Sequence, residues 1–207
     1  MTTQSKKQWK LLIAWLQKEK VRAIGASAMY GYQFQNMQHV AEKNGWHQFV
    51  AMENHYNLLY REDERELIPI CKQGGVMLMP YSPLAGGHLA RPTWDSSSKR
   101  SQVDTSARSK YDHAEQQDLP IIKRVAGLAE KHNVKMSQIA LAWQWAKGVT
   151  APIVGATKKQ YLDDAAQATE ITLTPEEVAY LDEPYTAHEI VGALDSNPGG
   201  LLPKDVK

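Results

Sequence analysis

The stretch "VMLMPYSPLAGG" (Val76–Gly87) joins a short apolar run to an abrupt exit that contains an aromatic ring, a proline and two glycines. The run from Val76 to Pro80 is typical of a buried strand. The exit from Tyr81 onward has two interpretations. It is either a tight turn, or a place where a flat ligand lies against the tyrosine ring while its charged part passes over the glycines.

The same unit recurs along the chain, because apolar strand-like runs alternate with amphipathic helical patterns. The first helical pattern carries Trp9, Leu12, Ile13 and Leu16 on one face. Strands are expected within residues 21–27, 47–59, 76–87 and 149–159. This alternation predicts an α/β fold with parallel strands and helices packed outside them. The pattern alone does not decide between an open doubly wound sheet and a closed barrel.

Several residues mark the expected ends of helices. Gly45 is placed to stop the second helix, and Ser137 to cap the helix that contains "SQIALAWQWAKG". Thr174, Pro175 and Glu177 have the spacing of a capping box with proline at the first helical position.

A polar segment from residue 91 to 118 has no apolar period, and a loop of this length is usually functional or disordered. The 207 residues are otherwise expected to form a single domain.

Composition excludes several classes of protein. The net charge of +1 predicts neither a nucleic-acid partner nor an anionic membrane surface. Apolar runs stay below the roughly 18 residues that span a bilayer, and the N-terminal "MTTQSKKQWKLL" lacks the apolar core of a signal peptide. A single cysteine, Cys71, excludes an intramolecular disulfide and favours a cytoplasmic protein.

Ligands of parallel α/β folds bind at the carboxyl ends of the strands, and four such ends can be recognised. They are Ser27, Glu53–Tyr56, Tyr81–Gly87 and Gly155–Lys158. In the last, Gly155 and Ala156 would let a phosphate approach the backbone, Thr157 would cap the next helix, and Lys158 would add a cation.

Each candidate also has a purely structural interpretation. "GATKK" is equally the start of a capped helix, Tyr81 a packing residue with its hydroxyl in water, and Glu53 a solvated surface group rather than a general base. The seven histidines show no metal-ligand spacing. Sequences typical of acyl transferases, NTPases or Rossmann folds do not occur.

Taken in order, the motifs "VRAIGASAMY", "NHYNLLYREDERELIPICK", "MPYSPLAGGHLARP" and "APIVGATKKQYLDD" resemble the second half of the aldo-keto reductase family. The resemblance runs from about Trp9 to Ile190. It implies (β/α) units equivalent to the second half of a (β/α)₈ TIM barrel, with about four strands and outer helices.

The resemblance also implies an NADP(H) site. Tyr81 would stack on the nicotinamide ring, and Ser27 and Glu53 would meet its carboxamide. Thr157 and Lys158 would meet the 2′-phosphate, and Asp164 the adenine. The residues that would bind the cofactor are Ser27, Glu53, Tyr81, Ser82, Pro83, Leu84, Gly86, Gly87, Gly155, Ala156, Thr157, Lys158 and Asp164.

Three departures from the family pattern stand out. Glu53 occupies a position where the family usually has glutamine, and an ionised carboxylate cannot donate to the carboxamide oxygen. Tyr161 and Ala165 replace a glutamine and an asparagine near the adenine. The family's catalytic tyrosine, aspartate, lysine and histidine come from its first four strands, and none can be aligned here. His47, His55 and Tyr56 are candidate substitutes without an assigned role.

The sequence therefore predicts an NADP(H)-linked oxidoreductase of this family, represented by a truncated chain that lacks the catalytic half. The alternatives are a non-catalytic NADP(H)-binding or protein-interaction remnant, and an inert fragment. Four parallel strands cannot close a barrel, so open edges and an exposed apolar face are expected. Val50, Met52, Met77 and Met79 are candidates for that face. The sequence therefore predicts a homodimer of two half barrels, which would pair the open edges and cover the apolar face.

Overall fold

Three short parallel strands form the sheet of this protein. The computed structural model describes residues 3–94, 109–111 and 114–191. Strands β1 (Gly25–Ser27), β2 (Ala51–Glu53) and β3 (Met77–Leu78) lie in the order β1-β2-β3, so each strand pairs with the next along the chain. Helices connect them, as parallel pairing requires. The predicted α/β class is confirmed.

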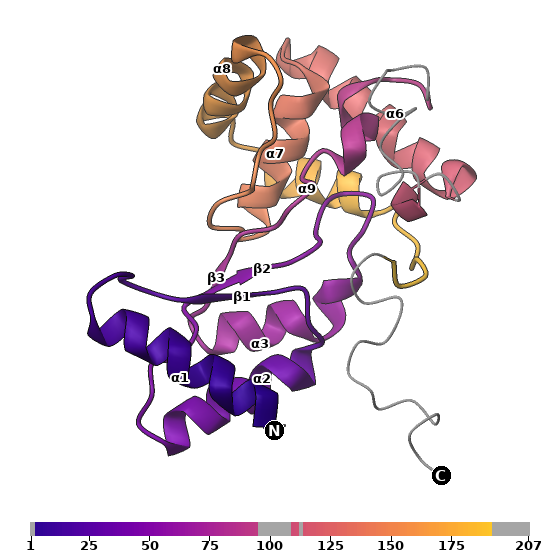
Figure 1. The fold of residues 1–207 in the computed structure, drawn as a ribbon. Helices are drawn as coiled ribbons and strands as arrows, with labels where there is room; N and C mark the ends of the chain where they lie inside the picture. The colour runs from indigo at the N-terminus through magenta and orange to yellow at the C-terminus, as the bar shows by residue number, and fades with distance from the viewer. Residues whose placement is uncertain (1–2, 95–108, 112–113, 192–207) are drawn as a thin grey trace.

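Helices surround the strands in two groups. Figure 1 places α1, α2 and α3 on one side of the strands and α6 to α9 on the other. The α-helices are α1 (Thr3–Gln17), α2 (Gly31–Lys43), α3 (Leu67–Gln73), α6 (Glu115–His132), α7 (Met136–Ala146), α8 (Lys159–Gln167) and α9 (Pro175–Asp182). The 3₁₀ turns are η1 (Glu62–Arg65), η2 (Ala85–Ala90) and η3 (Ala168–Glu170).

One face of the sheet packs into the core. Ala26, Met52 and Leu78 are neighbours across the three strands, and all three are buried. They belong to one apolar cluster that extends from Trp9 in α1 to Leu181 in α9. Burial of this face therefore fixes the register, since a slip by one residue would turn the buried side chains outward.

The predicted fourth strand is not assigned as a strand, but its path is the expected one. The amide N–H groups of Thr150 and Ala151 donate to the Leu78 carbonyl, at 3.0 and 3.2 Å. The Ile153 N–H donates to the Pro80 carbonyl at 2.8 Å. Residues 150–153 therefore run beside β3 without completing a regular ladder.

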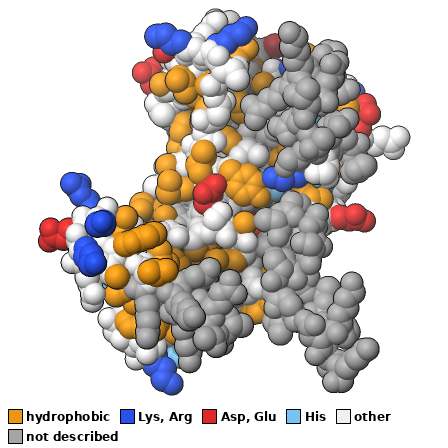
Figure 2. Space-filling view, viewed as in Figure 1, with side chains coloured by type: hydrophobic (Ala, Val, Ile, Leu, Met, Phe, Trp, Pro, Cys, Tyr) orange, Lys and Arg blue, Asp and Glu red, His pale blue; other side chains and the backbone are white. Residues whose placement is uncertain are grey.

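The opposite face of the sheet is open among the described residues. Met77 (43%) and Ile153 (39%) are exposed on this face, whereas Val50 (40%) is exposed but precedes Ala51, the partner of Met77, and so lies on the same side of the strand as Met52. Of the side chains expected on such a face, Met52 is wholly buried instead and Met79 is partly buried. In Figure 2, orange side chains line the hollowed waist between the two groups of helices. We call the surface formed by Met77 and Ile153 the open face.

Some predicted helix ends are confirmed and others are wrong. Gly45 follows α2 with φ +63°, a conformation that glycine adopts without steric cost. The Thr174 hydroxyl accepts from the Glu177 N–H and the Glu177 carboxylate accepts from the Thr174 N–H, which confirms the capping box. Ser137 is not a cap, because α7 begins at Met136 after Lys135. Thr157 is not a cap either, because Lys158 precedes α8.

The expected polar loop over residues 91–118 is shorter at its far end. Helix α6 begins at Glu115, and Asp118 in its first turn is buried. Residues 95–108 and 112–113, and with them most of this loop, lie outside the described residues.

Candidate functional site

All four strand-like segments run in the same direction, so their carboxyl ends lie at the same end of the sheet. Ser27 and Glu53 are partners in register, and the Ser27 hydroxyl donates to the Glu53 carbonyl at 3.2 Å. The Tyr81 N–H donates to the Asn54 carbonyl at 2.9 Å. Since residues 150–153 run parallel to β3, the "GATKK" segment leaves from the same edge. The structure thus brings Ser27, Glu53 and Tyr81 together at the carboxyl ends of the strands, and the "GATKK" segment follows residues 150–153 at the same end.

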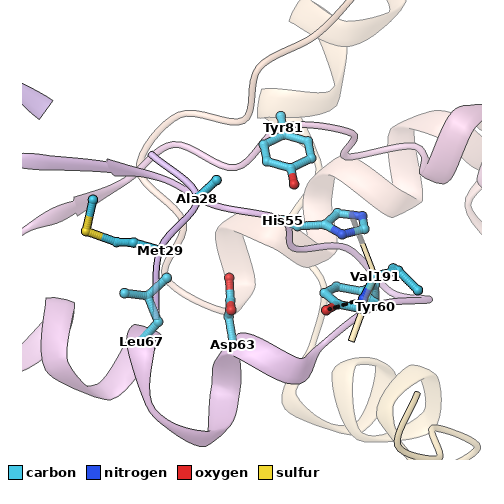
Figure 3. Close-up of a pocket in the computed structure, with 8 residues that line it drawn as sticks. All are labelled: Ala28, Met29, His55, Tyr60, Asp63, Leu67, Tyr81 and Val191. Carbon is cyan, nitrogen blue, oxygen red and sulfur yellow. Dashed lines mark hydrogen bonds between the residues drawn. The ribbon is translucent and has the colours of Figure 1, made fainter. Parts of the chain in front are cut away.

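Three rings lie parallel at this edge. The His55 ring is stacked 4.1 Å from the Tyr60 ring and 5.1 Å from the Tyr81 ring, with interplanar angles of 15° and 10°. In Figure 3, His55 lies between the two tyrosines, and all three rings line a small pocket. The pocket is lined by Ala28, Met29, His55, Tyr60, Asp63, Leu67, Tyr81 and Val191. A half-buried Tyr81 at the end of this stack can offer a flat surface to another ring.

His55 is a buried, uncharged imidazole. Only 6% of the residue is exposed, and burial, together with the Lys110 charge, lowers its pKa from 6.5 to about 3. Its Nε2 lies 2.7 Å from the Tyr111 hydroxyl, and its Nδ1 has no hydrogen-bond partner among the described residues. An imidazole that stays neutral at physiological pH is a poor proton donor. His55 is therefore placed to stack and to hold Tyr111 rather than to act as a general acid.

Asn57 and Tyr111 tie the neighbouring loops together. The Asn57 amide donates to the Ser82 carbonyl at 2.9 Å and to the Tyr111 hydroxyl at 3.0 Å. We call the three stacked rings of Tyr60, His55 and Tyr81 the platform. Tyr111 is buried, so residues 109–111 are anchored against it. Next to this anchor, the Lys110 ammonium lies 4.6 Å from the centre of the Tyr81 ring. A cation over an aromatic face is a favourable arrangement.

A carboxyl group lies at the floor of the pocket. Asp63 points toward the pocket from η1 (Figure 3), and the Asn54 amide donates to it at 3.1 Å. Burial raises the pKa of Asp63 to about 6, and the hydrogen bond from Asn54 only partly offsets this. Burial and the nearby Asp63 and Glu53 charges raise the pKa of Tyr81 to about 12. The Tyr81 phenol therefore stays protonated.

The turn after Tyr81 contains four residues with left-handed backbone conformations. Ser82 and Ala85 have φ of +54° and +48°, and Gly86 and Gly87 have φ of +65° and +106°. Positive φ is costly for serine and alanine, so the surrounding structure holds this turn in place. Of the other two predicted residues here, Pro83 is buried and Leu84 is half-buried.

The "GATKK" segment is open to solvent. Gly155, Ala156, Thr157 and Lys158 are all exposed, and the Lys158 ammonium lies 5.8 Å from the centre of the Tyr161 ring. The main-chain N–H groups at the start of α8 would favour an anion.

Asp164 already has a partner within the chain. The Lys135 ammonium binds both of its carboxylate oxygens, at 2.7 and 2.6 Å. Any role toward a ligand must therefore coexist with this ion pair.

The other candidate catalytic substitutes lie elsewhere. His47 is exposed and precedes β2, so it lies toward the opposite edge of the sheet. The Tyr56 hydroxyl donates to Glu64, and its ring packs 5.2 Å from the Trp143 ring. Burial and the Glu64 contacts raise the pKa of Tyr56 above its usual range. Neither residue reaches the Tyr81 platform as a proton donor.

The residues fit a dinucleotide better than a metal ion. An aromatic platform, a serine hydroxyl, a glycine-containing turn and a basic helix start suit a flat ring joined to phosphates. Within residues 3–94, 109–111 and 114–191, no group of three or more histidine, cysteine or acidic residues is placed to hold a metal. None of the helices in the same ranges has the length and apolar character needed to cross a bilayer.

The comparison with known families decides the ancestry of the chain. The model of the aldo/keto reductase family matches residues 1–186. The chain belongs to the aldo/keto reductase family. The resemblance predicted from the strand-end motifs is thereby confirmed.

Individual family members agree. A versiconal hemiacetal acetate reductase of Aspergillus parasiticus is 44% identical over 172 residues, which are 83% of this chain and 50% of that protein. An aldo-keto reductase of Alternaria alternata is 42% identical over 172 residues, 83% of this chain and 46% of that protein. The chain thus spans about half the length of the curated relatives it matches.

A solved structure supports the fold. The thermostable aldo-keto reductase crystallised with the inhibitor epalrestat matches with a TM-score of 0.62 and 24% identity, over 85% of this chain and 53% of that chain.

Sequence reasoning did not identify the residues that surround Tyr81. Lys110 lies in a polar segment without periodicity, so no pattern connects it to the platform. Asn57 and Tyr111 are 54 residues apart in the sequence, and only the fold brings their side chains together. His55 was a candidate without a role, and the structure gives it one as the middle ring of the stack.

Proposed function

We propose that this chain binds NADP(H) and forms the dinucleotide side of a carbonyl-reducing oxidoreductase site. The observation that carries the proposal is the convergence of the Tyr81 ring, the Ser27 hydroxyl and the basic "GATKK" segment at one edge of the sheet. Family membership supports it independently, because aldo-keto reductases generally use this cofactor. NADPH would supply the hydride for reduction of a carbonyl.

Each predicted residue has a role in this proposal. Tyr81 offers its ring to the nicotinamide, and Ser27 and Glu53 hold the carboxamide. The turn that contains Ser82, Pro83, Leu84, Gly86 and Gly87 lines the path of the diphosphate. Gly155, Ala156, Thr157 and Lys158 receive the 2′-phosphate, where exposed N–H groups and a cation favour negative charge. Asp164, oriented by Lys135, borders the adenine.

A proton donor for the carbonyl oxygen must come from elsewhere. Among the described residues at the platform, His55 is neutral and Tyr81 has a raised pKa. Loss of general acid catalysis typically costs about 10²–10⁴-fold in rate. We therefore propose that the described residues at this site bind the dinucleotide and do not themselves supply the acid, in line with the prediction that the family's catalytic residues have no counterparts in this chain.

A second candidate function is dinucleotide binding without turnover. The neutral His55 and the engagement of Tyr56 with Glu64 favour it, because neither can replace the missing acid. The same alternative includes a protein that only binds other proteins and neither binds nor turns over the dinucleotide. A cytoplasmic setting stays a prediction from the cysteine content.

The open face supports a partner proposal. β1 and residues 150–153 are the two outer edges of the described sheet, and both retain unpaired backbone groups. In a closed parallel barrel, β1 of one copy would pair with residues 150–153 of the other, and a two-fold axis would create both seams. We propose a homodimer of this kind.

Fluorescence titration with NADPH tests the main proposal. Saturable binding at micromolar nucleotide is expected, and Tyr81→Ala and Lys158→Ala should each weaken it. Lys123→Ala, which removes an exposed lysine of α6, is the matched control. Absence of binding by the unaltered chain up to millimolar NADPH would overturn the proposal. Binding without reduction of a panel of aldehydes would select the second candidate.

A further inference from the structure

Lys110 occupies the position that a cationic ring would take on the platform. Its ammonium lies 4.6 Å from the centre of the Tyr81 ring, and both side chains are half-buried. The face of an aromatic ring attracts positive charge, and this attraction strengthens as water is excluded. The contact shows that the Tyr81 face accepts a cation.

The position of Lys110 is fixed by the residue that follows it. Tyr111 is 2% exposed, and its hydroxyl contacts both the His55 ring at 2.7 Å and the Asn57 amide at 3.0 Å. Because Tyr111 is anchored, a ligand that displaces the ammonium from the Tyr81 face leaves it close to the rim of the platform. The Lys110 charge then remains near whatever binds there.

Charges of both signs act on the platform. The Glu53 and Asp63 carboxylates both act electrostatically on Tyr81, and Lys110 acts on His55. Any charge on a bound ring is therefore felt by one cation and two carboxyl groups. The two redox forms of the cofactor differ here, since the oxidised nicotinamide ring is cationic and the reduced ring is neutral.

We propose that Lys110 makes this site prefer the reduced, uncharged nicotinamide over the oxidised, cationic one. The inference rests on the proposed NADP(H) site and adds to it a determinant of redox-form selectivity. Two effects act in the same direction. The oxidised ring competes with the ammonium for the Tyr81 face, and it meets a like charge at the rim. The reduced ring is uncharged, so the Lys110 charge does not repel it and it competes less directly with the ammonium.

The test is the ratio of two dissociation constants. Both forms carry the same phosphates, so the ratio of Kd for NADP⁺ to Kd for NADPH isolates the charge of the ring. Lys110→Met keeps the length of the side chain and removes its charge. This variant should lower the ratio by about threefold to tenfold, as expected for one partly screened charge pair. Lys123→Met, on the exposed side of α6, should leave the ratio unchanged.

Two further variants make the assignment specific. Glu53→Gln removes a negative charge beside the platform and should move the ratio in the opposite direction to Lys110→Met. Tyr111→Phe keeps the lysine but removes the hydroxyl contacts that anchor it, so it should lower the ratio by less than Lys110→Met does. Thermal melting checks that each variant remains folded.

The outcomes separate the inference from the proposed function. If the unaltered chain binds neither form, the proposed NADP(H) site fails and the inference fails with it. If both forms bind and Lys110→Met leaves the ratio unchanged, only the inference is overturned. A lower ratio in Lys110→Met together with a higher ratio in Glu53→Gln supports it.

Discussion

The Nε2 of His55 lies 2.7 Å from the Tyr111 hydroxyl, while Nδ1 on the other side of the ring meets no hydrogen-bond partner in the described part of the chain. The pKa of His55 is lowered to about 3, first by burial and then by Lys110. A proton on this ring would be buried without a counter-ion. The unfolded chain, by contrast, accepts that proton near the ordinary pKa of 6.5.

Acid should therefore destabilise the protein through His55. Because the folded pKa is the lower one, the stabilisation is complete above about pH 6.5 and is lost as the pH falls toward 3. The loss approaches about 1.4 kcal/mol per pH unit within that window. His55→Phe keeps a stacked ring but cannot titrate. We expect urea unfolding of the variant to depend less on pH between 7.5 and 4.5, by about 2 kcal/mol.

The change in slope with pH distinguishes this effect from the simple loss of a hydrogen bond. Loss of the Tyr111 contact lowers stability equally at both pH values. Asp63 titrates with the opposite sign, because its raised pKa of about 6 makes folding less favourable as the pH rises through that value. Asp63 is present in both proteins and cancels in the comparison. Parallel curves for the variant and the unaltered chain would contradict the assignment.

The strand pattern and the carboxyl edge of the sheet could be predicted from the sequence because both depend on local signals. Apolar runs at Met52 and Leu78 and the stop at Gly45 are read directly from residue order. The Thr174 cap was predictable because its partner is three residues away. Ser137 and Thr157 failed as caps because neither residue occupies the N-cap position of its helix.

The candidate site was only partly predictable, because its chemistry depends on contacts between distant residues. Tyr81 and Ser27 follow from their places at strand ends. The ammonium of Lys110 over Tyr81 and the Lys135 ion pair of Asp164 depend on how loops and helices pack. No local pattern encodes either contact.

Arg61 should contribute strongly to stability. It is 9% exposed, it binds Glu64 and Asp182 at 2.8 and 2.9 Å, and its guanidinium lies 4.8 Å from the Tyr185 ring. Arg61→Met would leave partly buried carboxylates without their cation, at a cost of about 3 kcal/mol. Arg61→Lys should recover little of this stability, because a lysine ammonium cannot bind Glu64 and Asp182 with the planar geometry of a guanidinium. Urea denaturation measures both variants.

Arg65 provides the matched control for that experiment. Its side chain is 68% exposed, and it forms an ion pair with Glu62 at 2.8 Å. The Glu62 carboxylate is only 8% exposed, but it also accepts from the Tyr185 hydroxyl and the His188 N–H, so Arg65→Met should lower the free energy of unfolding by less than about 1 kcal/mol. Equal losses for Arg61→Met and Arg65→Met would show that burial of Arg61 is not what stabilises the protein.

Two threonines at helix starts should differ in their effect on stability. The Thr174 hydroxyl accepts from the Glu177 N–H at 3.2 Å, so Thr174→Ala should cost about 1 kcal/mol. Thr157 is exposed and does not cap α8, so Thr157→Ala should change stability by less than about 0.5 kcal/mol. Chemical denaturation of the two variants compares them directly. An equal cost for both would place a functional cap at Thr157 after all.

The open face should control self-association. Met77 and Ile153 are 43% and 39% exposed and flank the edge between β3 and residues 150–153. If two copies close a barrel through this face, Met77→Lys or Ile153→Lys would place a charge in an apolar interior and weaken the dimer by at least tenfold. Leu162→Lys alters a 53% exposed side chain on α8 and should leave the dimer intact. Sedimentation velocity over a range of concentrations measures the dimer constant. A compact monomer of the unaltered chain at tens of micromolar would overturn the dimer. A monomer produced equally by Leu162→Lys would move the interface away from the open face.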